Sequence, residues 1–240
     1  MEFFDKQFTD IRAFLDRKKA SGHVREIIHD KKTDWPKGGN RNLVLEQDMA
    51  VELGNPQVES TSFLLWENDS GKIKDGRISI IGPDLNETTE KKLPFGKIVL
   101  VGGHAFSTEN SYGRYREMES IRYDIDLKGY MMRAASQYQR EWSRVSKEAI
   151  ANGFSFKILG GTLIDRFKEK DFVSSVEVIF ITSSKAEIIG IKGIADQAIR
   201  ITSAMNKMAV EMSFDCDACE FTDVCDDVAA LRSMRNKMNK

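Results

Sequence analysis

Three cysteines gathered in one short segment are the residues of this chain best suited to metal chemistry. Cys216, Cys219 and Cys225 are its only cysteines, and they are spaced Cys-x2-Cys-x5-Cys. Two thiolates separated by two residues can converge on one metal from a single turn, and a third can close another coordination position. The spacing predicts an iron–sulfur cluster, with zinc as the alternative metal. Three reduced, partly buried cysteines without a ligand are the competing interpretation.

The charge around these cysteines favours a bound cation. Seven acidic residues and no Lys or Arg lie between Glu211 and Asp227. Because like charges repel, we expect a cation to be needed before this segment packs compactly. The fourth coordination position is open to water, to a partner's residue, or to a carboxylate of Asp215, Asp217 or Asp223. An exposed acidic tail that binds nothing is the alternative.

A second group of residues suits the recognition of anions. Six arginines lie between residues 114 and 144, and they are Arg114, Arg116, Arg122, Arg133, Arg140 and Arg144. Guanidinium groups bind phosphate and carboxylate through a planar fork. Trp142 lies among them and can stack on a purine or on a guanidinium. The alternative is a solvated surface where the arginines pair with Glu117, Glu119 and Glu141.

The overall composition excludes several classes of protein. The 36 basic and 37 acidic residues give a formal net charge of −1, which argues against a generally basic nucleic-acid-binding protein. No apolar run approaches the ~20 residues that cross a bilayer. The first residues lack the basic and apolar regions of a secretory signal. We therefore expect a cytoplasmic protein with reduced thiols and no nucleic-acid or membrane partner.

Hydrophobic periodicity and turn signals predict an α/β fold with a mixed sheet flanked by helices. Strand signals occupy residues 41–53, 62–66, 77–81, 97–101 and 173–182. Helical signals occupy residues 3–20, 109–122, 129–150, 162–168 and 184–208. The helix over 129–150 rests on the three- and four-residue spacing of Met131, Ala135, Tyr138, Trp142, Val145 and Ala149.

The chain is expected to have three parts. Residues 1–40 form an N-terminal helical arm, which a loop over residues 31–39 separates from the rest because it contains Pro36 and two glycines. Residues 41–210 form the α/β body, and residues 211–240 form a short cysteine-containing tail.

Five segments, in the same order along the chain, resemble one known family. They are residues 51–58 (VELGNPQV), 76–85 (GRISIIGPDL), 93–99 (LPFGKIV), 142–149 (WSRVSKEA) and 161–182. Together they resemble the β subunit of the CO dehydrogenase/acetyl-CoA synthase complex, over approximately residues 45–225. The resemblance implies an α/β fold like the middle part of that subunit, just before its metal domain.

The resemblance also implies roles for particular residues. In the family, a Cys-x2-Cys pair begins the domain that holds the nickel–iron–sulfur A-cluster. Cys216 and Cys219 are similar to that pair, and Cys225 is similar to a third cysteine at a shorter spacing. With the chain ending at Lys240, the Cys-Gly-Cys that holds the distal nickel is absent, so we expect no complete nickel A-cluster. The Trp-x-Arg match implies contact with CoA.

The Trp-x-Arg match consists of Trp142 and Arg144, the two residues that the resemblance identifies as cofactor-binding.

The leading functional expectation is an acetyl-CoA-synthase-like protein of anaerobic C1 metabolism whose tail binds an iron–sulfur cluster. Its partners would be a corrinoid protein or other subunits of a C1 complex. One alternative is a non-catalytic accessory module that binds CoA or a corrinoid protein. Another is an enzyme whose nickel site is completed by a partner chain.

Overall fold

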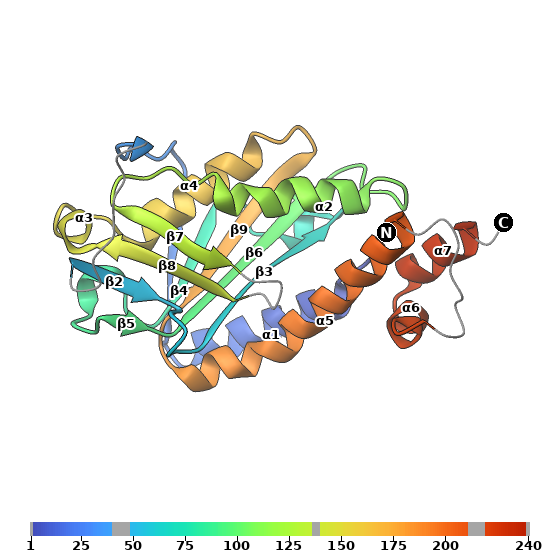
Figure 1. Ribbon diagram of the computed structural model, residues 1–240, viewed down its shortest axis with the longest axis horizontal. Coiled ribbons are helices and arrows are strands. Elements are labelled where there is room, and N and C mark those ends of the chain that lie inside the picture. Colours follow the sequence, from blue (N-terminus) through green and yellow to red (C-terminus); the bar gives the residue numbers. More distant parts are fainter. Residues whose placement is uncertain (1, 40–48, 136–139, 211–218, 239–240) are drawn as a thin grey trace.

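A computed structural model describes residues 2–39, 49–135, 140–210 and 219–238 of the protein (Figure 1). Its centre is a five-stranded mixed sheet with the strand order β1-β4-β9-β6-β3. These strands are β1 (Val24–Ile28), β4 (Arg77–Ile81), β9 (Val173–Ile181), β6 (Phe95–Gly103) and β3 (Ser60–Glu67). The β4–β9 and β3–β6 pairs are parallel, whereas β1–β4 and β6–β9 are antiparallel.

A second sheet of four strands lies beside the first (Figure 1). Its order is β5-β2-β8-β7, with β5 (Lys92–Leu93), β2 (Ala50–Leu53), β8 (Glu141–Ser146) and β7 (Tyr130–Ala135). The β2–β8 and β7–β8 pairs are antiparallel, and β2–β5 is parallel. This sheet carries both members of the Trp-x-Arg match, because Trp142 and Arg144 lie on β8.

Helices cover both faces of the five-stranded sheet (Figure 1). The helices α1 (Asp5–Ala20) and α5 (Lys185–Val210) lie on one face, while α2 (Ser111–Ser120) and α4 (Phe156–Lys168) lie on the other. The remaining described helices are α3 (Lys147–Ala151), α6 (Thr222–Asp227) and α7 (Ala229–Met238). Short 3-10 turns occupy η3 (Ser70–Lys72), η4 (Leu85–Glu87) and η5 (Ile121–Tyr123). The predicted α/β class, with a mixed sheet between helices, is confirmed.

Aromatic and aliphatic side chains fill the space between these layers. Phe156 of α4 stacks on Phe180 of β9 with ring centres 4.7 Å apart, and Phe95 of β6 stacks on both. On the opposite face, Gly96 lets α5 approach, since a Cβ there would lie 2.9 Å from a methyl of Ile188. Burying these side chains supplies the main favourable free energy of folding.

Most of the predicted elements are confirmed. The helices expected at 3–20, 109–122 and 184–208 correspond to α1, α2 and α5, and the strands expected at 62–66, 77–81, 97–101 and 173–182 correspond to β3, β4, β6 and β9. The strand signal over 41–53 yields β2 at residues 50–53, and residues 40–48 lie outside the described ranges.

The helix predicted over residues 129–150 is wrong. The chain there forms β7 and β8, and a short helix, α3, follows. The three- and four-residue spacing of apolar side chains suggested a helix, but β8 instead pairs with β2 on one side and with β7 on the other. The pairing of β8 with β2 is non-local, so the periodicity within this segment does not report it. Tyr138 lies outside the described residues.

The helix expected over residues 162–168 starts earlier, at Phe156, so Gly160 and Gly161 lie inside α4. Both glycines allow close packing, because neither carries a Cβ. A Cβ on Gly160 would lie 3.0 Å from the side chain of Ile78, and one on Gly161 would lie 2.6 Å from Thr33 Oγ1 and 2.8 Å from His29 Nδ1. The two glycines therefore let α4 rest on β4 and on the segment after β1.

The first forty residues contact the α/β body at several points. Helix α1 packs against α5, and β1 is hydrogen-bonded to β4 along its length. His29 Nε2 lies 2.7 Å from Asp165 Oδ1 of α4, and the Thr33 backbone N–H donates to the other carboxylate oxygen at 2.8 Å. The division of the chain into three parts at residues 40 and 210 stays a prediction.

Within the described ranges, no helix combines the length and the apolar character that a membrane crossing needs.

Candidate functional site

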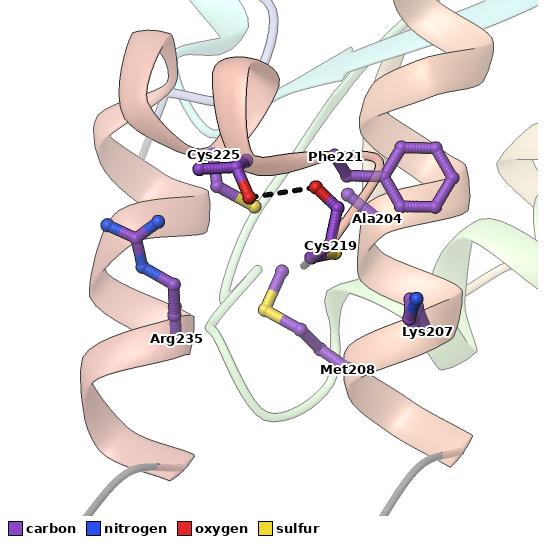
Figure 2. A pocket seen from close by; sticks show the side chains of 8 residues that line it. Ala204, Lys207, Met208, Cys219, Phe221, Cys225 and Arg235 are labelled. Carbon is purple, nitrogen blue, oxygen red and sulfur yellow. Dashed lines mark hydrogen bonds between the residues drawn. The ribbon is translucent and has the colours of Figure 1, made fainter. Parts of the chain in front are cut away.

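Two of the three cysteines lie in one pocket at the end of α5. Helix α5 extends past the sheet, and α6 and α7 pack beside its last turns (Figure 1). Cys219 and Cys225 both line the pocket, and the other lining residues are Ala204, Lys207, Met208, Phe221, Thr222 and Arg235 (Figure 2). Cys216 lies outside the described residues, so its position relative to this pair stays a prediction.

Local hydrogen bonds hold the two cysteines in place. Thr222 donates its hydroxyl to the carbonyl oxygen of Cys219 at 2.9 Å, which fixes the turn before α6 (Figure 2). The backbone N–H of Cys225 donates to the carbonyl of Phe221 at 2.9 Å, which holds Cys225 on α6. The turn and α6 therefore place Cys219 and Cys225 at the same pocket.

Ion pairs attach this cysteine segment to the rest of the molecule. Arg200 of α5 binds Asp223 at 2.7 Å, and Arg235 of α7 binds Asp226 at 2.8 Å. Lys237 bonds to Glu109, at 2.6 Å, in the loop before α2. These pairs are largely exposed, so each contributes modestly to stability. Together they orient α6 and α7 against α5.

The chemistry of the pocket suits a thiophilic metal. Its lining is almost entirely apolar atoms and sulfur, and Cys225 is only 6% exposed. Two cations, Lys207 and Arg235, also line it and can offset the charge of thiolates. Among the described residues, no three His, Cys, Asp or Glu side chains converge on one point. Binding of a metal by these cysteines therefore stays a prediction, and Asp223 binds Arg200 rather than lining the pocket.

Trp142 and Arg144 lie on β8, at a distance from the cysteine pocket along the fold. The indole of Trp142 has two guanidinium groups over its ring, Arg133 at 5.6 Å and Arg144 at 5.4 Å. Arg144 is 8% exposed, and its Nε donates to Glu52 Oε1 at 2.6 Å. Asn55 also donates to the Glu52 carboxylate, so Arg144 belongs to a buried polar network. Contact of Trp142 and Arg144 with CoA stays a prediction.

Arg114, Arg122 and Arg140 of this stretch bond to other groups of the protein. Arg122 binds Glu119 at 2.9 Å, one of the pairings that the surface interpretation expected. Arg140 donates to the carbonyl of Val58 at 2.8 Å, and Arg114 donates to the carbonyl of His104 at 2.7 Å. Arg133 differs, because it is exposed and faces Trp142 from the edge strand β7.

A buried ion pair between the two sheets was not predicted. Lys97 of β6 contacts Glu141 of β8, which the sequence had suggested as a surface partner of arginine. Burial lowers the pKa of Lys97, and the opposing attraction of Glu141 does not fully compensate. Ser62 donates its hydroxyl to Glu141 at 3.0 Å. Burial, and then the charge of Glu141, raise the pKa of Tyr130, whose hydroxyl lies 3.1 Å from the Ser143 hydroxyl.

A sequence signal exists for Lys97 of this pair. Lys97 interrupts the apolar strand β6 (FGKIVLVGG), whereas Glu141 is the first residue of the polar strand β8 (EWSRVS). A charged residue within an otherwise apolar strand is almost never fully buried unless it is paired. The identity of the partner, however, depends on the packing of the two sheets.

Comparison with known proteins supports the resemblance. A family model described as the CO dehydrogenase/acetyl-CoA synthase complex beta subunit matches residues 39–187, more than half of the chain. The chain belongs to this family. The match includes β2 to β9, and with them Lys97, Glu141, Trp142 and Arg144. It ends before the cysteine pocket, so the family membership rests on the α/β body.

Several named relatives share this part of the chain. The carbon monoxide dehydrogenase/acetyl-CoA synthase subunit alpha of Moorella thermoacetica is 32% identical over 136 residues, which is 56% of this chain and 18% of that protein. The acetyl-CoA decarbonylase/synthase complex subunit beta 1 of Methanosarcina mazei is 30% identical over 192 residues, 76% of this chain and 39% of that subunit. This member of the family therefore spans less than two fifths of the length of these relatives.

Proposed function

We propose that this family member is an acetyl-CoA-synthase-like protein of anaerobic C1 metabolism whose cysteine tail binds an iron–sulfur cluster through Cys216, Cys219 and Cys225. Its partners are other subunits of a C1 complex, with a corrinoid protein among the candidates. A cytoplasmic location is part of the proposal, because thiolate ligands persist where thiols stay reduced. Zinc is the alternative metal, and a complete nickel A-cluster is not part of the proposal.

One observation carries the proposal: Cys219 and Cys225 line the same apolar pocket. Thiolates are ligands that suit soft metals and iron–sulfur clusters. Cys216 precedes Cys219 by three residues, which suits binding to the same centre.

The charges around the pocket also support a thiolate-bound centre. Thiolates add negative charge to a segment that is already acidic. Lys207 and Arg235 line the pocket and oppose that charge. A cluster held here would supply one-electron transfer, and its potential would depend on this balance of charge and on exposure to solvent. The chain's own contribution is to hold the centre with three thiolates and to shield it with α5 and α7.

Anaerobic reconstitution with ferrous iron and sulfide tests the proposal. The full chain should acquire the broad visible absorbance of a cluster, together with bound iron and sulfide. Cys219→Ser and Cys225→Ser should each abolish that absorbance, because a hydroxyl is a poor ligand for soft iron–sulfur centres.

Asp223→Asn is the matched control for these variants. It removes the exposed ion pair with Arg200 next to the pocket but leaves every thiol in place. Cluster formation should therefore be unchanged. A wild-type protein that takes up no iron under these conditions would contradict the proposal, and stoichiometric zinc in the protein from its native host would favour the alternative metal.

A non-catalytic CoA-binding module is the second candidate, and the geometry at Trp142 favours it. Two guanidinium groups lie close to the indole ring, and an aromatic ring beside arginines can contact the adenine and phosphate groups of CoA. Arg133 is the exposed member of the pair. A CoA bound there would be contacted by Trp142 and Arg133, while Arg144 stays paired with Glu52 beside the indole.

Calorimetry and tryptophan fluorescence with CoA test this candidate. CoA should quench Trp142, and Arg133→Ala should weaken binding by about tenfold or more, because a charge-assisted contact to phosphate is lost. Arg166→Ala is a control, since it removes an exposed arginine that pairs with Glu169 on α4. The absence of both heat and quenching with CoA would rule the candidate out.

A further inference from the structure

A cavity outside the cysteine pocket lies beside the first turn of α1. It has a volume of about 560 Å³, and its walls come from the start of α1, the middle of α5, and α6 and α7. Figure 1 shows the amino-terminal end of the chain beside α5 and α7. The cavity shares no lining residue with the cysteine pocket. Ligand sites typically measure about 300–1,000 Å³, so this cavity has room for several side chains of a partner.

The deep wall of the cavity is apolar. Phe3, Ile201 of α5 and Val224 of α6 line it, and they are 3%, 1% and 4% exposed. Ala229 and Ala230 at the start of α7 also line it, and their short side chains leave the space open. Apolar side chains of a partner would lose contact with water here, which favours binding through the hydrophobic effect.

Carboxylates dominate the rim of the cavity. Glu2, Asp5 and Asp227 line it, and Lys6 is the one lysine or arginine among its described lining residues. Glu2, Lys6 and Asp227 are exposed, and the side chain of Asp5 is 45% exposed. The described rim therefore carries a net negative charge above an apolar wall.

On the α1 side of the rim, several carboxylates share one ammonium group. Lys72 Nζ lies 2.9 Å from Asp5 Oδ1 and 3.9 Å from Glu2 Oε1. The same nitrogen lies 3.3 Å from Glu67 Oε2, whose side chain is 3% exposed. The hydrogen bond with Asp5, and then the charge of that carboxylate, raise the pKa of Glu2. A further cation in the cavity would thus meet a favourable potential.

We infer that this cavity is the docking site for a basic amphipathic helix of a partner subunit. Such a helix carries apolar side chains along one face and lysine or arginine beside them. The described walls are helical and present no strand edge, so they suit a ligand that satisfies its own backbone hydrogen bonds. The inference rests on the part of the proposed function that assigns the chain to a complex, and it needs no metal at the cysteines.

This chain itself supplies no segment that matches the cavity as well. Residues 211–218 contain three acidic residues and no Lys or Arg, so their charge has the same sign as the rim. In a second copy, the basic end of α1 is already engaged, because Lys18 pairs with Glu187 and Lys19 pairs with Glu26. Charge complementarity therefore favours a partner of different sequence.

Fluorescence anisotropy with a labelled synthetic helix tests the inference. The probe is about 14 residues long, or about four turns, with leucine along one face and lysine along the other. A second peptide has the same composition in an order that gives no apolar face. The full chain, without added iron, should bind the first peptide at least about tenfold more tightly, because only that peptide can pack on the apolar wall. Equal binding of the two peptides would show recognition of charge alone and would overturn the inference.

Matched substitutions separate the cavity from the rest of the surface. Ser233→Trp, at an exposed lining residue of α7, should fill the cavity and weaken binding by about tenfold or more, whereas Asn236→Trp, exposed on α7 but outside the lining, should not. Glu2→Gln combined with Asp227→Asn should weaken binding by about tenfold and reduce its dependence on salt. Asp16→Asn removes an exposed carboxylate toward the other end of α1 and should leave binding unchanged.

The remaining outcomes are equally distinct. Failure of the wild type to bind either peptide, or undiminished binding by Ser233→Trp, would overturn the inference. A dimer in light scattering that Ser233→Trp dissociates would assign the cavity to a second copy and would also overturn it. Because cluster reconstitution is measured separately, a chain that forms the cluster but binds no peptide loses only the docking site. A chain that binds the peptide but forms no cluster loses only the metal centre.

Discussion

Lys97 and Glu141 form an ion pair enclosed between the two sheets. Lys97 comes from β6 of the five-stranded sheet and Glu141 from β8 of the four-stranded sheet, and their side chains are 4% and 0% exposed. Ser62 of β3 donates to the same carboxylate at 3.0 Å. The pair therefore joins the sheets through charge as well as through apolar contact.

Breaking this pair from one side should strongly destabilise the fold. Lys97→Met leaves the Glu141 carboxylate buried without its counter-charge, which costs about 3–5 kcal/mol. The double variant Lys97→Met/Glu141→Gln removes both charges and keeps an acceptor for Ser62, so it should recover much of that loss. Urea unfolding of the three proteins measures the difference, and a double variant no more stable than the single one would contradict the explanation.

The close approach at Gly161 makes it intolerant of a side chain. Gly161→Ala places a methyl 2.6 Å from Thr33 Oγ1 and 2.8 Å from His29 Nδ1, so the segment after β1 must move. We expect a loss of about 1–3 kcal/mol from this overpacking. Gly190→Ala is the matched control, because that glycine lies in α5 with nothing within 4 Å of the added Cβ.

The control should change stability in the opposite direction. Alanine is a better helix former than glycine by about 1 kcal/mol, so Gly190→Ala should raise the midpoint of thermal unfolding. Equal effects of the two substitutions would show that α4 does not depend on the close contact with His29 and Thr33.

Arg144 and Arg133 both lie close to the indole of Trp142, but they should contribute differently to the free energy of unfolding. Arg144→Ala leaves Glu52, which is 1% exposed, without its guanidinium, and should lower the free energy of unfolding by about 3 kcal/mol. Arg133→Ala removes an exposed side chain and should change it by less than about 0.5 kcal/mol. Denaturant unfolding checks both values. A stable Arg144→Ala protein would contradict the structural role of the Arg144–Glu52 pair.

The edge strand β1 should contribute a pH-dependent component to stability. The hydrogen bond from Arg25, followed by the backbone N–H of Asp84, lowers the pKa of Glu87 from 4.5 to about 2. A carboxylate with a lowered pKa stabilises the fold fully above about pH 4.5, and this contribution disappears as the pH falls toward about 2. Because Arg25 and Glu87 are both more than two fifths exposed, the effect should stay below about 1 kcal/mol.

The comparison of wild type with Glu87→Gln isolates that component. Wild type should be the more stable protein near neutral pH, and the two proteins should converge as the pH falls through the window between about 4.5 and about 2. Urea midpoints measured at several pH values check this. A difference that stays constant down to the lowest pH would show that the charge of Glu87 does not contribute.

Local patterns in the sequence were sufficient for the elements that carry their own signal. The apolar spacing of Phe8, Ile11 and Leu15 predicts α1, and these side chains are buried against the body. The long periodic stretch after residue 184 predicts α5 in the same way. The residues of β4 and β9 form short apolar runs between turns, which predict strands without identifying their neighbours.

The sequence alone also determined the grouping of the cysteines and the family, because spacing along the chain and segment identity need no coordinates. Tertiary structure decided that residues 130–135 and 141–146 are strands, that Glu141 binds Lys97, and that Met208 shares a pocket with Cys219 and Cys225. The physical reason is the same in each case. A local pattern records which residues avoid water, whereas strand pairing and burial of a charge or a sulfur depend on partners far away in the chain.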